Sequence, residues 1–461
     1  MNIALSPATQ RMMALLGAAT LLLGAVLMPM KMMLLVPALV LGLLLLALYQ
    51  FPRALAVLLV MTCALALDFQ MDVTLNTGIG AVLVKSVPFG IAAVLLLRYG
   101  PSREINWPFL TFTAIAGLSL AILPIGHVAT NEDMLRSYIG SAAPFVLGFA
   151  VAPRRFWTLL IRGAALVPII SAVCSVPAMA IGFWTPFDIG GRFQGMHSPP
   201  FLAGFCVTAI FACLLEYLRG FRALWLVVAG LDLAILMLTQ ARAPLISVLL
   251  FLGLVFLLSG REIMPLRRKV DLVMGGVLPG LILLSPAIWY AMNRIRDMAN
   301  DMSGRDIIWP YFLDAIEARP LFGFGLGAGK LIVNPEDPTI RLLGSSAAHN
   351  EYLRLSVDAG ILGCAAIFLS IAAWVWIGSR RCPSSDRLVL RAALAAALLH
   401  SGFDNTLIAS TALMQFSFFA AAMARGQADL RETSSRRSRR RHESRLEEGA
   451  MSAVLARQGR W

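Results

Sequence analysis

Long apolar stretches recur along this chain from end to end, and they constrain its fold more than any other feature. Most of them approach or reach about 17–25 residues, the length that an α-helix needs to cross a bilayer. The 461 residues are 58% hydrophobic and only 14% charged, whereas soluble domains average about half apolar and a quarter charged. The sequence therefore predicts an all-α polytopic membrane protein with about 12–14 transmembrane helices.

The apolar stretches divide the chain into four parts. Residues 1–291 form a predicted transmembrane helical bundle, residues 292–350 a large loop with short helices, and residues 351–424 the C-terminal transmembrane helices. Residues 425–461 are a basic tail of low complexity, predicted to be disordered. The first apolar stretch lacks an A-x-A cleavage pattern and is interpreted as a retained span. The predicted spans are 12–30, 32–49, 54–67, 79–97, 107–125, 137–152, 163–183, 199–217, 223–240, 243–258, 270–291, 360–378, 388–400 and 405–424.

Arginines and lysines are distributed unevenly between the loops on the two sides of the predicted bundle. Cytoplasmic loops of membrane proteins carry an excess of basic residues, so the asymmetry places both termini in the cytoplasm. The large loop 292–350 then lies on the outer side. Basic residues predicted at the cytoplasmic side include Arg53, Arg154, Arg155, Arg219, Arg222 and Arg261, whereas the short outer loops hold only Lys31, Arg136, Arg192 and Arg242.

The net charge of +13 does not indicate nucleic-acid binding, because the basic residues lie between apolar spans as topology requires. The six cysteines show no CxxC spacing, so neither a zinc site nor a disulfide framework is predicted. The basic tail is interpreted as a stop-transfer segment, with binding to anionic lipid head groups as the alternative. Lys85 and Asp232 are costly inside spans, and we interpret them as a structural pair.

Residues 345–363, SSAAHNEYLRLSVDAGILG, concentrate polar side chains directly before a long apolar run. Ser345 or Ser346 is predicted to cap a helix that begins near residue 348 and continues into the next span. His349 on this helix is either a membrane-interface histidine without a role or a functional group, and the spacing alone leaves both open. Helical spacing also predicts ion pairs, interpreted as surface pairs: Glu351 with Arg354 and Arg354 with Asp358.

Two further segments of the large loop have a recognisable pattern. Residues 303–319, SGRDIIWPYFLDAIEAR, predict an amphipathic helix at the membrane surface, with a capping-box-like start at Ser303 and an end before Pro320. The next stretch, PLFGFGLGAGK, alternates glycines, which fits either a flexible turn or an anion-binding nest. The predicted apolar face of the helix consists of Ile308, Tyr311, Phe312, Ala315 and Ile316.

Two arginines stand on the outer side against the positive-inside pattern. Arg192 occurs in GGRFQGMHSPP, and Arg242 occurs in LTQARAP between two closely joined spans. Together with Arg305 and His349 they predict a cationic cup for an anionic group at the bilayer surface, because the guanidinium fork suits phosphate. Snorkelling to phospholipid phosphate is the alternative for each arginine alone.

These segments resemble the shared domain of O-antigen ligases and related bacterial polysaccharide polymerases. SGRDIIWPYFLDAIEARPLFGFGLGAG followed by SSAAHNEYLRLSVDAGILG is similar to that family's pattern G-R…W…P-x-x-G-x-G-x-G and its later His-Asn. RFQGMHSPPFLAGF resembles the family's R-x-x-G…P-N element, although Pro200 stands where Asn is usual. LTQARAP resembles its T-x-S-R element, with Ala241 where Ser is common. The resemblance covers about residues 190–375.

The resemblance implies an inverting, metal-independent and cofactor-free glycosyltransferase of the bacterial inner membrane. Its donor would be a glycan on undecaprenyl pyrophosphate, used at the periplasmic face, and its acceptor lipid A–core or a growing polysaccharide. Arg192 and Arg242 would bind the pyrophosphate, with Arg305 a weaker contributor. His349 would act as the base that deprotonates the acceptor hydroxyl or would itself bind pyrophosphate, and Asn350 would orient His349 or the donor.

The sequence leaves two classes of function open. A lipid-linked oligosaccharide flippase or another transporter is the alternative to the glycosyltransferase. Transporters of this kind place ionisable residues inside their spans, and here only Lys85 and Asp232 do so, so the glycosyltransferase is favoured. Ligases and polymerases share the donor and differ in the acceptor, so this choice also stays open.

Overall fold

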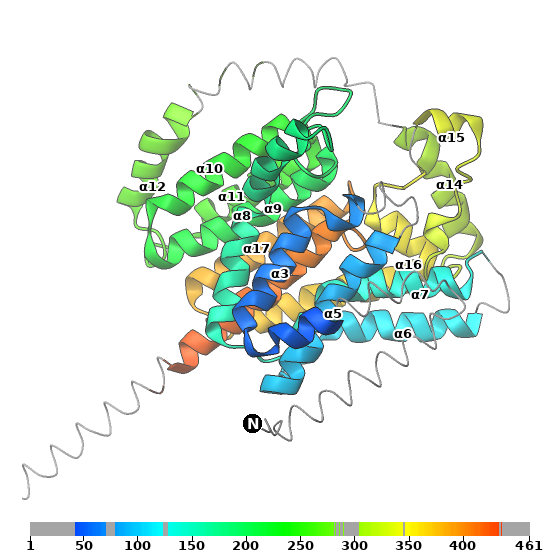
Figure 1. Cartoon of the computed structure of the whole chain (residues 1–461), viewed down its shortest axis with the longest axis horizontal. Coiled ribbons are helices and arrows are strands. Elements are labelled where there is room, and N and C mark those ends of the chain that lie inside the picture. The colour runs from blue at the N-terminus through cyan, green and yellow to red at the C-terminus, as the bar shows by residue number, and fades with distance from the viewer. Residues whose placement is uncertain are drawn as a thin grey trace, which may run out of the picture.

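The structure is a computed structural model, and its described residues form a bundle of α-helices (Figure 1). It describes residues 42–70, 79–122, 128–280, 304–343 and 346–432, together with positions 282, 285, 289 and 435. In these ranges there is no β-strand, and only two isolated β-bridges occur. The predicted all-α fold is confirmed.

The elements follow one another along the chain with short connections. The first half contains η2 (Leu48–Gln50), α3 (Pro52–Ala64), α5 (Ile79–Tyr99), α6 (Trp107–Ile122), α7 (Asn131–Ala142), η4 (Ala143–Phe149), α8 (Arg154–Ala180), α9 (Pro199–Gly220) and α10 (Ala223–Leu238). The second half contains α11 (Arg242–Leu258), α12 (Leu266–Leu272), the π-helix η5 (Val273–Val277), α14 (Arg305–Ala318), η6 (Ala328–Lys330), α15 (Pro338–Leu343), α16 (Glu351–Ser379) and α17 (Ser384–Ser401). A last helix covers residues 410–432.

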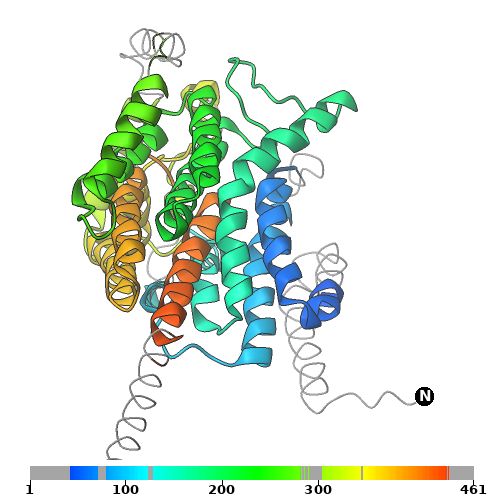
Figure 2. The same ribbon diagram turned by 90° about the vertical axis from the view of Figure 1, so that its left-hand side faces the viewer.

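Helix α9 forms the centre of the bundle and packs against α8, α10, α11 and α17. Its apolar window is 94% buried, whereas α8 and α16 bury only 44% and 39% of theirs. Among the described residues these three helices are long and apolar enough to cross a membrane. Apolar side chains that stay exposed all along a helix suit contact with lipid. Figure 2 shows α8 lying beside α3 on one flank of the bundle.

The predicted spans appear as helices with shifted ends, apart from one. Helix α8 begins at Arg154 rather than at 163, and α16 begins at Glu351 rather than at 360. The span predicted at 137–152 is wrong as a single α-helix, because α7 ends at Ala142 and a 3₁₀-helix follows. Pro144 lies at the start of that 3₁₀-helix and has no N–H to continue an α-helical ladder. The span predicted at 12–30 and nearly all of the C-terminal tail lie outside the described residues.

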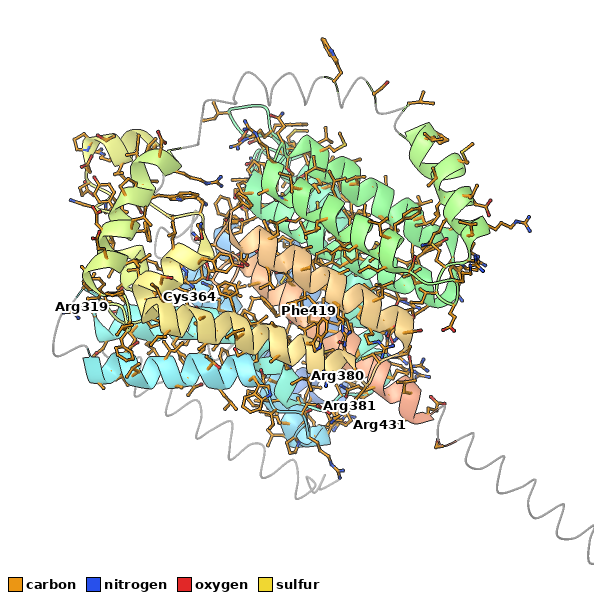
Figure 3. The ribbon with its side chains drawn as sticks, turned by 180° about the vertical axis from the view of Figure 1, so that it is seen from behind. Arg319, Cys364, Arg380, Arg381, Phe419 and Arg431 are labelled. Atoms are coloured by element: carbon orange, nitrogen blue, oxygen red, sulfur yellow. The ribbon has the colours of Figure 1, made fainter. Side chains whose placement is uncertain are left out.

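The bundle has two ends that carry different chemistry. We call one the loop end, because α14, the segment 346–350 and Arg242 lie there. We call the other the arginine end, since Arg53, Arg155 and Arg222 lie there. Helix α16 runs between the two ends, as Figure 3 shows from Arg319 on one side to Arg380 and Arg381 on the other.

Helix α14 confirms the predicted amphipathic helix in part. Ile308 and Phe312 are buried and pack with Val357 of α16, but Tyr311 is 41% exposed and does not belong to the buried face. The helix begins after Gly304, which has a left-handed φ of 74° and forms no side-chain cap. The predicted cap Ser303 lies outside the described residues.

The glycine-rich stretch after α14 is neither a free turn nor a nest for an external anion. It lies across a kink of α16 at Gly360, where φ is 69° and a Cβ would come within 2.1 Å of the Leu321 carbonyl oxygen. The backbone N–H of Phe324 donates to the Val357 carbonyl at 2.9 Å. The backbone N–H of Gly329 donates to Oδ1 of Asp358 at 2.7 Å. The glycines therefore permit close packing on α16, and the anion they bind is the protein's own carboxylate.

The predicted pairing of Glu351, Arg354 and Asp358 is confirmed, but its placement on the surface is wrong. Arg354 is 2% exposed, and both carboxylates are completely buried. The Arg354 guanidinium donates to Glu351 through Nε and Nη2, and to Oδ2 of Asp358 through Nη1 at 2.7 Å. Burial of three charges is tolerated because each is paired and hydrogen-bonded. We call these three residues the buried triad.

The predicted pair of Lys85 and Asp232 is also wrong. Asp232 on α10 is completely buried, and its Oδ2 accepts from the Cys213 thiol at 3.7 Å. Lys85 lies elsewhere, with its ammonium group against Gly140 of α7. Cys213 faces Asp232 because α9 and α10 pack as neighbours, which the sequence alone does not reveal.

Candidate functional site

The segment before α16 is held in an irregular conformation that positions His349. Asn350 is the N-cap of α16, and its Oδ1 accepts from the backbone N–H groups of Tyr352 and Leu353 at 3.0 and 3.2 Å. The predicted cap at Ser345 or Ser346 is therefore wrong. His349 precedes the helix with a left-handed φ of 45°, so it does not share a helical face with later residues.

A side chain of α14 fixes the same segment from the other side. The indole Nε1 of Trp309 donates to the Ala348 carbonyl oxygen at 2.9 Å. The cap by Asn350 and this bond hold the backbone on both sides of His349. A side chain that must work as a base in one orientation needs such support, because small displacements from productive geometry reduce rates strongly.

His349 faces a carboxylate that sequence reasoning missed. Its Nδ1 lies 3.6 Å from Oδ1 of Asp404, in the turn between α17 and the last helix. The buried His400, one helical turn before Asp404, places its Nε2 3.9 Å from the other carboxylate oxygen. Burial by itself raises the pKa of Asp404, but the His349 and His400 rings and the Asn405 backbone N–H lower it overall. The carboxylate therefore stays ionised at neutral pH.

The contact between His349 and Asp404 sets the role that the imidazole can have. A carboxylate at Nδ1 favours a proton on that nitrogen and directs the lone pair to Nε2 on the opposite side of the ring. His349 is 36% exposed, so it is accessible to a ligand. A sequence signal for Asp404 was present: His400 and Asp404 stand four residues apart in a short loop of the predicted outer side.

Arg305 and Arg242 lie beside the same carboxylate. Nη2 of Arg305 donates to the Phe403 carbonyl oxygen at 2.9 Å, directly before Asp404. Burial lowers the pKa of Arg305, the charge of Asp404 raises it, and the charge of Arg242 lowers it again. Two guanidinium groups close enough to repel each other create a positive potential that favours an anion between or above them.

Arg242 begins α11, which packs against α17 just before the turn with Asp404. Arg192 lies in the loop between α8 and α9, and its Nε forms an ion pair with Oδ2 of Asp188 at 2.7 Å. Burial raises the pKa of Asp188, but the backbone N–H and the guanidinium of Arg192 lower it overall. The neighbouring Phe193 N–H donates to the Leu238 carbonyl at the end of α10, so this loop is attached close to the start of α11.

The structure thus brings His349, Arg305 and Arg242 together around Asp404. Arg192 is attached to the same end of the bundle, although Asp188 partly neutralises its charge. The side-chain oxygen of Asn350 caps a helix, so this residue supports His349 through the backbone. The cationic cup predicted from the sequence therefore gains a carboxylate and a second histidine at its base.

The fold and this site together define an all-α membrane protein with a histidine–carboxylate pair and arginines at one end of its bundle. Residues 226–368 match the family model described as O-antigen ligase. No curated protein matches the chain. The match covers α10, α11, α14 and the first part of α16, and with them Arg242, Arg305 and His349. The predicted resemblance is confirmed, and the chain belongs to the O-antigen ligase family, whose members are membrane glycosyltransferases of ligase or polymerase type.

Proposed function

We propose that this protein moves a glycan from undecaprenyl pyrophosphate to an acceptor hydroxyl, with inversion, without a metal, and at the periplasmic face of the inner membrane. The observation that carries the proposal is the pairing of His349 with Asp404 beside Arg305 and Arg242. The group combines a base with fixed cations, and this transfer requires both. The family match to O-antigen ligase supports the same reaction class.

The transfer is a single displacement at the anomeric carbon. The acceptor oxygen attacks this carbon while its proton passes to Nε2 of His349, and the C–O bond to the pyrophosphate breaks with its electron pair on the phosphate oxygen. Asp404 holds the imidazole by Nδ1 and stabilises the imidazolium that forms, so it is a positioning residue. Attack opposite to the leaving group inverts the anomeric configuration.

The arginines act on the leaving group. Negative charge grows on the pyrophosphate as the C–O bond breaks, and fixed cations stabilise that charge more in the transition state than in the ground state. Arg242 and Arg305 are held by α11 and α14 and need not move during the reaction. Arg192 would reach the same group by exchanging Asp188 for phosphate. The acceptor would be lipid A–core or a growing polysaccharide.

The test uses the full chain in nanodiscs with an undecaprenyl-pyrophosphate glycan and a polysaccharide acceptor. We expect wild type to release undecaprenyl pyrophosphate with no added metal or ATP. His349→Ala should reduce turnover by about 10²–10⁴-fold, and Arg242→Ala by about 10²-fold. Arg341→Ala, on the exposed face of α15, is the matched control and should keep wild-type turnover. Unchanged turnover in both site variants would refute the assignment.

A further inference from the structure

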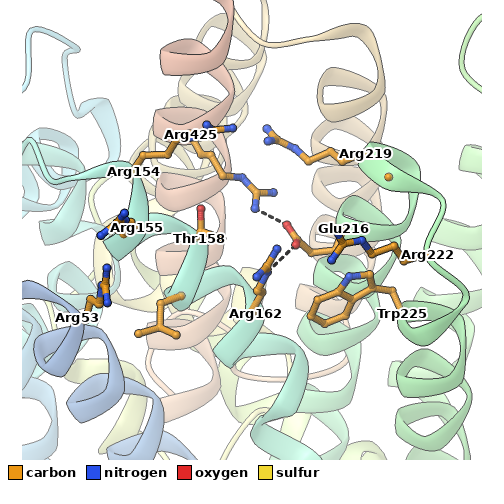
Figure 4. A pocket seen from close by; sticks show the side chains of 12 residues that line it. Arg53, Arg154, Arg155, Thr158, Arg162, Glu216, Arg219, Arg222, Trp225 and Arg425 are labelled. Atoms are coloured by element: carbon orange, nitrogen blue, oxygen red, sulfur yellow. Dashed lines mark hydrogen bonds and ion pairs between the residues drawn. The ribbon is translucent and has the colours of Figure 1, made fainter. Parts of the chain in front are cut away.

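A second cationic site lies at the arginine end, where the mechanism uses nothing. Its pocket has a volume of about 640 Å³ and is lined by seven arginines and a single carboxylate, Glu216. This volume falls within the range of about 300–1,000 Å³ that is typical of small-molecule sites. Figure 4 shows its arginines, which come from the starts of α3, α8 and α10, the end of α9, and the last helix.

The carboxylates of this region leave the pocket with an excess of positive charge. Glu216 pairs with both Arg162, at 2.8 Å, and Arg425. Asp386 and Asp429 bind the side of the pocket formed by Arg219, and Asp429 also binds Arg154. The other three lining arginines, Arg53, Arg155 and Arg222, are exposed and form no ion pair with any described residue.

Arg425 gives an independent indication that the pocket takes a ligand. It is only 2% exposed, and one nitrogen, Nη1, donates to Glu216. Its Nε and Nη2 are buried and have no hydrogen-bond partner among the described residues. Leaving charged donors buried without partners is costly, and an anion in the pocket that Arg425 lines would satisfy them.

The two cationic sites lie at opposite ends of one helix. Arg222 directly precedes α10 and Arg242 follows it, so a helix of 16 residues, roughly 24 Å long, separates them. An anion in the pocket therefore cannot contact His349 or Arg305. The positive-inside pattern predicts that this end faces the cytoplasm.

We propose that the pocket binds a phosphate-bearing anion through Arg425, Arg155, Arg222 and Arg53. Guanidinium groups bind phosphate oxygens in pairs of parallel hydrogen bonds, and several can share one multivalent anion. Trp225 and the stem of Leu159 give the pocket an apolar wall beside the charges. The phosphate belongs to an anionic phospholipid head group or to a free polyphosphate, and both offer the same contacts.

The experiment measures both sources with the purified full chain. Inorganic pyrophosphate is titrated into detergent-solubilised protein, and cardiolipin retention is measured by native mass spectrometry after exchange from nanodiscs of phosphatidylcholine with cardiolipin. The test variants are Arg425→Gln and the double variant Arg155→Gln/Arg222→Gln, which changes only exposed positions and should keep the fold. Arg261→Gln, an exposed arginine after α11 outside the pocket, is the matched control.

We expect at least one probe to bind wild type and the Arg261→Gln control equally, and to bind both test variants at least about tenfold more weakly. Loss of cardiolipin retention alone identifies a lipid head group, whereas loss of pyrophosphate binding identifies a soluble polyphosphate. If neither probe distinguishes the double variant from the Arg261→Gln control, the proposal is wrong. Glycan transfer is not measured here, so the result is independent of the function of His349.

Discussion

The buried triad and the site around His349 lie within ten residues of each other and treat charge in opposite ways. In the triad, Arg354 is 2% exposed and its two carboxylates bind it from within the same helix. At His349, the side chain is 36% exposed and its carboxylate comes from a distant turn at 3.6 Å. A closed and fully paired network stabilises a fold, whereas an open pair can exchange a proton with a ligand.

The difference depends on backbone as much as on side chains. The triad lies within helix α16 and is covered by the glycine-rich stretch, which donates the Gly329 N–H to Asp358. His349 lies one residue outside the helix cap, in a left-handed conformation that turns it away from α16. One residue at a helix boundary thus separates a structural network from a candidate site.

The largest effect is expected from Arg354→Met, which leaves two buried carboxylates without a cation. Breaking a buried ion pair costs about 3–5 kcal/mol of stability, so we expect little folded protein after purification. The measurement is the yield and the midpoint of thermal unfolding in detergent. Arg341→Met on the exposed face of α15 should behave as wild type. A stable Arg354→Met protein would show that the triad does not hold α16 and the glycine stretch together.

The next effect is expected from Gly360→Ala at the kink of α16. Alanine would adopt φ 69° and ψ 176° only with strain, and its Cβ would collide with the Leu321 carbonyl oxygen. We expect a loss of stability on the order of 3 kcal/mol, read from the thermal midpoint. Gly253→Ala in α11, where a Cβ meets open space, is the control. Equal midpoints would mean that the glycine stretch can leave the kink without cost.

The sequence was sufficient for the class of fold and for most of the cationic residues at the loop end. Apolar length predicts helices because each span depends on local composition. Arg192 and Arg242 were noticeable because they violate the positive-inside pattern, which is also a local property. What the sequence could not predict was which side chains meet. Asp404 reaches His349, and Cys213 reaches Asp232, through packing of helices.

The same limit explains the errors. Helical spacing correctly predicted that Arg354 pairs with Glu351 and Asp358, but spacing does not show whether a face is covered. The covering element is the glycine stretch, which the sequence left open between a turn and an anion nest. Likewise, Ser345 and Ser346 are good caps by residue type, yet Asn350 caps the helix because α14 and the kink fix where α16 begins.

A moderate effect is expected from Asp404→Asn, which keeps the size of the side chain and removes its charge. Without the carboxylate the protonated imidazole is less stabilised, so we expect glycan transfer to fall roughly 10–100-fold. The acidic limb of the pH–rate profile should move to lower pH, because loss of a nearby negative charge disfavours the protonated base. Asp314→Asn on the exposed face of α14 is the matched control. An unchanged pH profile with reduced turnover would make Asp404 a merely structural neighbour.

The smallest effect is expected at Lys330, which lies between the two regions compared here. Burial, Lys85 and Arg354 lower its pKa from the usual 10.5 to about 8. Between these values the unfolded chain binds a proton that the folded chain does not, so stability rises as the pH increases through this window. The gain should be small, because Lys330 remains partly exposed and solvent screens its charge.

Lys330→Met removes this titration, and it should increase the thermal midpoint near pH 7 by a few degrees while changing it little near pH 10.5. The midpoints of wild type, Lys330→Met and the non-titrating control Arg341→Met are compared in detergent at both pH values. Arg341→Met should follow wild type. If Lys330→Met instead lowers the midpoint at pH 7, the positive charge of Lys330 stabilises the buried triad by its attraction to Asp358 and Glu351 more than its burial costs. The triad would then require an external cation and would not be a closed network.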